Sequence, residues 1–176
     1  MTLTQCCGRC AVGDLTHDDL CEIAVRFLQN NGFNVAFGDR FQSSNGTGEQ
    51  PDAIGFRSGV SCLLEAKVSR SDFLADKKKW FRQQPEKGMG DWRFFISPPD
   101  IIKPEDLPAG WGLLHVKGKR VFKVHGWPPN SYWQSKKPFS ANKQAECDHM
   151  YSALRRLQIR GHLHEIYEGI SKGAAI

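Results

Sequence analysis

Residues 51–67 read PDAIGFRSGVSCLLEAK and decide the fold, because they contain two apolar runs separated by a short polar turn. The first run spans 52–56 and the second spans 62–66, with Arg57-Ser58-Gly59-Val60 between them. Apolar runs of this length bounded by turn residues are typical of strands. The segment therefore predicts a β-hairpin or a closely spaced antiparallel pair.

Charged residues stand at the ends of these two predicted strands. Asp52 opens the first strand, and Glu65 and Lys67 close the second. Side chains alternate along a strand, so Glu65 and Lys67 share one face, and pairing of the strands brings Asp52 across from them. The three charged groups are expected to converge at one edge of the sheet.

Two carboxylates held close together repel each other unless a cation lies between them. Mg²⁺ suits this position, and Mn²⁺ is the alternative, because Mg²⁺ prefers oxygen ligands, keeps several waters and accepts phosphate oxygens. We predict that Asp52 and Glu65 are metal ligands and catalytic residues. Lys67 is the third catalytic residue, which orients a water or stabilises negative charge at phosphorus.

Helices are predicted on both sides of this pair of strands. Thr16 is expected to cap a helix that runs to about Asn30, with apolar residues at helical spacing. Ser71 is expected to cap a second helix that runs to about Arg82. The Ser- and Gly-rich run 43–48 is expected to be a mobile loop.

The remaining sequence predicts further strands and a helical tail. The expected elements are strands at 33–37, 93–96, 112–116 and 120–124, a helical turn at 104–107, and a helix at 140–159 with a continuation to Tyr167. This order is typical of an α/β fold with a mixed sheet flanked by helices. A chain of 176 residues fits one domain. We divide it into an irregular lead-in (1–15), a core (16–125), and a basic connection with a helical C-terminal extension of the same domain (126–176).

Pro51-Asp52 followed by Glu65-Ala66-Lys67 at the end of an apolar strand resembles the signature of the PD-(D/E)XK nuclease superfamily. The stretch Glu65-Ala66-Lys67-Val68-Ser69-Arg70-Ser71-Asp72-Phe73-Leu74-Ala75-Asp76, followed by Lys77-Lys78-Lys79-Trp80, resembles small bacterial and bacteriophage nuclease-like proteins, including MmcB-type DNA repair proteins. The resemblance covers about 16–125 and is strongest over 49–82. The chain departs from the MmcB pattern by an extra residue between Asp76 and Trp80 and by a different segment before Asp52.

This resemblance implies a restriction-endonuclease-like αβββαβ core and a Mg²⁺-dependent phosphodiesterase, a deoxyribonuclease of phage or bacterial DNA processing or repair. A further acid often joins such sites, and Glu22 and Glu49 are the two candidates here. The helical pattern places Glu22 opposite the apolar face, which favours a solvated position. Glu49 lies in the loop before Asp52, so the choice between them stays open.

A basic segment follows the predicted core strands. No acidic residue lies between Asp106 and Glu146, and the same span holds seven lysines and arginines and several aromatic residues. Cations mixed with aromatic faces suit phosphates and unstacked bases, although a solvated face over core aromatics has the same composition. We expect DNA contacts from Lys77, Lys78, Arg82, Lys117, Lys119 and Arg120. Lys77 is preferred on its helix because it falls within the apolar stripe.

Cysteine usage predicts reduced thiols in a cytoplasmic protein. Cys6, Cys7 and Cys10 include a Cys-x-x-Cys spacing that could hold half of a zinc site. Candidates for the other half lack paired spacing, so zinc at the N-terminal cysteines is not expected; they are His17, Cys21, Cys147 and His149.

No secretion signal or membrane-spanning run is apparent. The expected location is therefore the cytoplasm of a bacterium or of a phage-infected host cell. The sequence leaves a homodimer open.

Two other functions compete with a nuclease. The first is a catalytically silent nucleic-acid-binding module on a nuclease fold. The second is a phage-encoded protein that binds a host factor.

Overall fold

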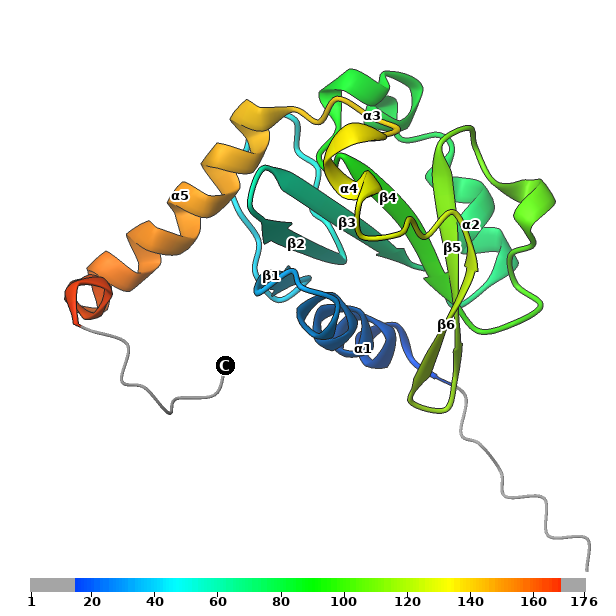
Figure 1. Cartoon of the computed structure of the whole chain (residues 1–176), viewed down its shortest axis with the longest axis horizontal. Helices are drawn as coiled ribbons and strands as arrows, with labels where there is room; N and C mark the ends of the chain where they lie inside the picture. The colour runs from blue at the N-terminus through cyan, green and yellow to red at the C-terminus, as the bar shows by residue number, and fades with distance from the viewer. Residues whose placement is uncertain (1–14, 169–176) are drawn as a thin grey trace, which may run out of the picture.

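The computed structural model describes residues 15–168 and contains one six-stranded mixed sheet. The strands lie side by side in chain order (Figure 1). They are β1 (Val35–Gly38), β2 (Ala53–Arg57), β3 (Val60–Ala66), β4 (Trp92–Ser97), β5 (Trp111–Lys117) and β6 (Arg120–His125). The pairs β3–β4 and β4–β5 are parallel, and the other three pairs are antiparallel.

Helices precede, interrupt and follow this sheet. They are α1 (His17–Asn30), α2 (Arg70–Asp76), α3 (Trp80–Gln83), α4 (Tyr132–Ser135) and α5 (Lys143–Ile159), with short 3-10 helices η1 (Pro85–Lys87), η2 (Pro104–Asp106) and η3 (Leu163–Tyr167). The order from α1 to β4 is the predicted αβββαβ core. The predicted fold class is therefore confirmed, including the antiparallel pair β2–β3 and the C-terminal helix.

The two faces of the sheet carry separate hydrophobic clusters. Helix α1 packs on one face, where Leu20 and Ala24 contact buried strand residues such as Leu64. On the other face, Phe73 of α2 packs with Leu63 and neighbouring strand residues. Strand β3 is buried along its whole length, because both faces are covered. The polar residues at its end are thus fixed by a rigid, central strand.

Helix α1 begins and packs as the sequence predicts. Thr16 accepts a hydrogen bond from the Asp19 backbone N–H, and the Asp19 side chain accepts one from the Thr16 N–H. This reciprocal arrangement is a capping box. Gly55 of β2 lets the chain approach closely after α1, since a Cβ there would lie 2.7 Å from the Cβ of Phe33.

The predicted helix from Ser71 to Arg82 is wrong in two respects. Its N-cap is Ser69 and not Ser71, because the Ser69 hydroxyl accepts a hydrogen bond from the Asp72 N–H. It is also broken between α2 and α3, where Lys79 adopts an extended backbone. Lys79 and Arg82 lie on either side of the first residue of α3, and both contact the buried carboxylate of Asp76.

Two loop and helix boundaries also differ from the predictions. The loop 43–48, which was expected to be mobile, is held by hydrogen bonds of the Asn45 side chain with Thr47 and with the Glu49 carbonyl. Thr47 and Glu49 are also buried. Helix α5 does not continue to Tyr167, because Gly161 has a positive φ that ends it. The short helix α4 was not predicted.

The N-terminal end of helix α5 lies near the sheet, and the rest of the helix extends away from the sheet (Figure 1). Within residues 15–168, no helix combines the length and apolar character needed to cross a bilayer.

A buried histidine on α5 makes stability depend on pH. His149 is 1% exposed; its Nδ1 lies 2.7 Å from the Ser43 hydroxyl, and its Nε2 has no hydrogen-bond partner among residues 15–168. Burial, together with the charge of Arg156, lowers the pKa of His149 to about 4. The unfolded chain therefore takes up this proton at higher pH than the folded protein.

We expect the free energy of unfolding to fall by roughly 3 kcal/mol, from this residue alone, as the pH decreases from about 6.5 to about 4. Urea unfolding at a series of pH values measures the effect. His149→Gln should flatten the slope, whereas the exposed His162→Gln should leave it unchanged. An identical slope in His149→Gln would contradict the prediction.

Candidate active site

Asp52, Glu65 and Lys67 lie together at the end of β3. Asp52 immediately precedes β2, and its Oδ2 accepts a 2.8 Å hydrogen bond from the Ala66 N–H, between Glu65 and Lys67. The Lys67 Nζ lies 3.5 Å from Glu65 Oε2, and both side chains are buried. The structure therefore brings together the three residues of the sequence motif.

The electrostatics of this group fit a cation. Burial and the negative charge of Glu65 raise the pKa of Asp52 to about 6, although Lys67 and His17 oppose the shift. Glu65 Oε1 is buried and accepts no aligned hydrogen bond from the part of the chain that the structure describes, even though Arg82 Nη2 lies 2.8 Å away. These oxygen donors match the preference of Mg²⁺ or Mn²⁺, so Asp52 and Glu65 fit the implied metal.

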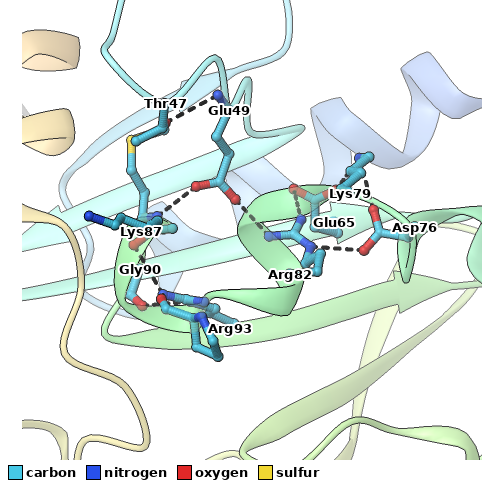
Figure 2. A network of polar contacts seen from close by, with 12 residues as sticks. Thr47, Glu49, Glu65, Asp76, Lys79, Arg82, Lys87, Gly90 and Arg93 are labelled. Atoms are coloured by element: carbon cyan, nitrogen blue, oxygen red, sulfur yellow. Dashed lines mark hydrogen bonds and ion pairs between the residues drawn. The ribbon is translucent and has the colours of Figure 1, made fainter.

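Arg82 is the centre of the surrounding network (Figure 2). Its guanidinium contacts Glu49 Oε1 at 2.6 Å, Glu65 Oε1 at 2.8 Å and Asp76 Oδ2 at 2.8 Å. The Arg82 side chain is only 7% exposed. One buried cation thus contacts three buried carboxylates. The sequence prediction placed Arg82 on DNA, and its contacts instead place it inside the site.

Asp76 is a site residue that the sequence reasoning missed. Its Oδ1 lies 2.8 Å from Lys79 Nζ and 3.4 Å from Lys67 Nζ. Burial alone would raise its pKa, but Arg82 and Lys67 lower it to about 2. The spacing of three residues between Asp76 and Lys79 was the signal that could have found it.

Glu49 and Glu22 have different positions. Glu49 is buried, and both of its carboxylate oxygens are used: one bonds to Arg82 and the other accepts the Met89 N–H at 2.6 Å. Burial raises the pKa of Glu49. Glu22 is exposed and pairs with Arg26 and Arg40. Glu49 therefore holds Arg82 in the site, whereas Glu22 points away from it.

The predicted nucleic-acid contacts are divided between two places. Lys77 does not enter the carboxylate cluster, because its Nζ lies over the Phe73 ring, 5.5 Å from the centroid. Lys78 is exposed. Three other predicted contacts are exposed on the β5–β6 hairpin; they are Lys117, Lys119 and Arg120. Lys79, which was not among the predicted contacts, does reach the carboxylates, because its Nζ lies 3.6 Å from Glu65 Oε2.

His17 is a further neighbour that the motif did not indicate. It is the first residue of α1, and its Nε2 lies 3.4 Å from Asp52 Oδ1. Asp52 therefore links the end of β3 to the start of α1.

Comparisons with known proteins give a structural likeness but do not indicate an activity. No protein-family model matches the chain, and no curated protein matches it. Among solved structures, the chain is similar to a protein of unknown function from Silicibacter pomeroyi, with a TM-score of 0.56 and 25% sequence identity. The match covers 91% of this chain and 100% of that protein. The likeness therefore extends beyond the αβββαβ core.

Proposed function

We propose that this chain is a metal-dependent DNA nuclease of the PD-(D/E)XK kind, which hydrolyses phosphodiester bonds in phage or bacterial DNA processing or repair. The observation that carries the proposal is the buried group at the end of β3. The hydrogen bond from the Ala66 N–H holds Asp52 beside Glu65 and Lys67. Charged groups whose pKa values are perturbed by burial and by a specific charged neighbour cluster at functional sites.

The chain's own residues would position the reaction. Asp52 and Glu65 would hold the cation, which lowers the pKa of a bound water and offsets charge at phosphorus. The Lys67 Nζ, 3.5 Å from Glu65, would orient the attacking water or donate to a phosphate oxygen. Arg82 and Lys79, which both contact the Glu65 carboxylate, would hold it in place.

DNA is the proposed substrate because of the charge distribution. The β5–β6 hairpin presents Lys117, Lys119 and Arg120 to solvent, and Lys78 is exposed after α2. Phe122, on β6, is 47% exposed in the same hairpin. Exposed cations and an aromatic ring suit a phosphate backbone and an unstacked base.

A metal-dependent cleavage assay tests the proposal. The purified chain is incubated with Mg²⁺ or Mn²⁺ and with single-stranded, duplex and branched DNA, and with RNA. We expect cleavage of DNA that chelation abolishes and that Asp52→Asn reduces by at least roughly 100-fold. Glu105→Gln, an exposed acid on η2, is the matched control and should cut normally. Intact nucleic acids in every reaction, or full activity of Asp52→Asn, would overturn the proposal.

One feature favours a second candidate, a catalytically silent nucleic-acid-binding module. Three cations contact the Glu65 carboxylate at 2.8–3.6 Å, and so compete with a metal for it; they are Lys67, Lys79 and Arg82. This module would bind DNA in a salt-sensitive manner without metal and without turnover. Cleavage in the assay above decides against it.

A further inference from the structure

A second group of metal-ligating side chains lies where α1 meets the end of β1. His17 and Cys21 are one turn apart on α1, so they share a face of the helix. Asp39 directly follows β1, and its backbone N–H donates to the Asp52 carbonyl. The ligand atoms of His17, Cys21 and Asp39 all lie within 4.8 Å of one another.

The spacing of these atoms is close to that of a tetrahedral zinc site. Zinc bonds of 2.0–2.3 Å place neighbouring ligand atoms roughly 3.3–3.8 Å apart. His17 Nδ1 already lies 3.5 Å from Cys21 Sγ. Small side-chain rotations would close the remaining gap, because His17 and Asp39 are only partly buried while Cys21 is fixed in the core.

The donor set distinguishes this cluster from the carboxylates at the end of β3. Asp52 and Glu65 offer only oxygen, which suits Mg²⁺. The cluster on α1 offers an imidazole nitrogen, a thiol sulfur and a carboxylate oxygen, which suit Zn²⁺ better than Mg²⁺. The two groups should therefore select different ions.

Asp52 connects the cluster to the proposed active site. Of the two ring nitrogens of His17, Nδ1 lies nearer to Cys21 Sγ, at 3.5 Å against 4.0 Å for Nε2, and Nε2 lies 3.4 Å from Asp52 Oδ1. A carboxylate that holds the second nitrogen of a metal-binding histidine fixes its tautomer and ring orientation. Asp52 is placed to do this for His17.

An open groove gives an ion access to the cluster. The groove lies between α1, β1 and α5, has a volume of about 880 Å³, and includes Cys21 and Asp39 in its lining. A solvent molecule can therefore complete a coordination shell that has three protein ligands.

We propose that His17, Cys21 and Asp39 form a Zn²⁺ site, separate from the carboxylates of Asp52 and Glu65 and oriented by Asp52. Binding releases the thiol proton of Cys21 to solvent, since the thiolate is the ligand. The proposal does not depend on nuclease activity.

Metal titration of the full chain tests this site. The metal-stripped protein is titrated with Co²⁺ and, separately, with Zn²⁺, and bound metal is counted after gel filtration. We expect about one Zn²⁺ per chain and, with Co²⁺, a thiolate-to-cobalt charge-transfer band in the near ultraviolet. Cys21→Ser should abolish the band, and His17→Ala and Asp39→Asn should each weaken Zn²⁺ binding by at least roughly tenfold.

Matched variants separate this site from the alternatives. Cys147→Ser, at an exposed free cysteine, and Glu65→Gln should both keep the band and the Zn²⁺. A combined Cys6→Ser, Cys7→Ser, Cys10→Ser variant should also keep them. Circular dichroism confirms folding, and Asp39→Asn, at a partly exposed position, serves if Cys21→Ser does not fold. A wild-type chain without the band, a band that survives in Cys21→Ser, or Zn²⁺ binding unaffected by Asp39→Asn would overturn the proposal.

Discussion

Lys67→Met is expected to lower the rate constant for DNA cleavage by roughly 10²- to 10³-fold under the proposed function. The Lys67 side chain is only 4% exposed, and its Nζ lies 3.5 Å from Glu65 and 3.4 Å from Asp76. An ammonium held by two carboxylates is preorganised, so it stabilises charge that develops at phosphorus without rearrangement. Methionine keeps most of the volume of the side chain and removes the charge.

The effect should fall on kcat more than on KM, because Lys67 is buried and DNA affinity depends on exposed cations. Lys77→Met is the matched control: it removes a nearby lysine that lies over the Phe73 ring and not in the site. Single-turnover cleavage and metal-free DNA binding are measured for both variants, with urea unfolding to verify that they are folded. Wild-type kcat in Lys67→Met would remove the lysine from the mechanism.

Arg82→Met is expected to lower the free energy of unfolding by roughly 3–5 kcal/mol. The guanidinium contacts three carboxylates whose side chains are at most 2% exposed; they are Glu49, Glu65 and Asp76. Breaking a buried ionic group by removing one partner leaves charges that water cannot reach. Urea unfolding at neutral pH and low salt measures the loss.

Acidification gives this prediction a second readout. Arg82 and Lys67 hold the pKa of Asp76 at about 2 against the effect of burial. Asp76 therefore stabilises the wild-type fold above pH 4, and this contribution is lost as the pH falls toward 2. Without Arg82 the Asp76 carboxylate should protonate at higher pH, so the gap in free energy of unfolding between Arg82→Met and wild type should narrow on acidification.

Arg26→Met is the control for Arg82, because Arg26 is 62% exposed and pairs with the exposed Glu22. Its effect should stay below about 0.5 kcal/mol. Equal losses for Arg26→Met and Arg82→Met, or a gap that does not change with pH, would contradict the role assigned to the buried network.

Local sequence patterns predicted the elements around the candidate site well. The apolar spacing and the Thr16 cap located α1, and the two apolar runs around Gly59 located β2 and β3. Both signals arise from short-range rules, namely helical periodicity, capping and strand alternation. The break between α2 and α3 was missed, because it depends on contacts of Lys79 and Arg82 with carboxylates distant in the sequence, such as Glu65.

The roles of the residues around the motif could be assigned only from the tertiary structure. The sequence left the choice between Glu22 and Glu49 open, and burial separates them: Glu49 lies within the network and Glu22 lies in solvent. Lys77 was preferred over Lys79 from the helical pattern. A helix that ends at Asp76 changes which lysine faces the site.

The sequence by itself determined the mixed α/β fold and the group Asp52, Glu65 and Lys67, because strand alternation and an antiparallel pair fix their geometry locally. Only the tertiary structure decided that Arg82 contacts both Glu65 and Asp76, and that His17 and Cys21 lie beside Asp39. These contacts join residues from different elements. Their distances are set by how α1 and α3 pack against the sheet, which no local pattern encodes.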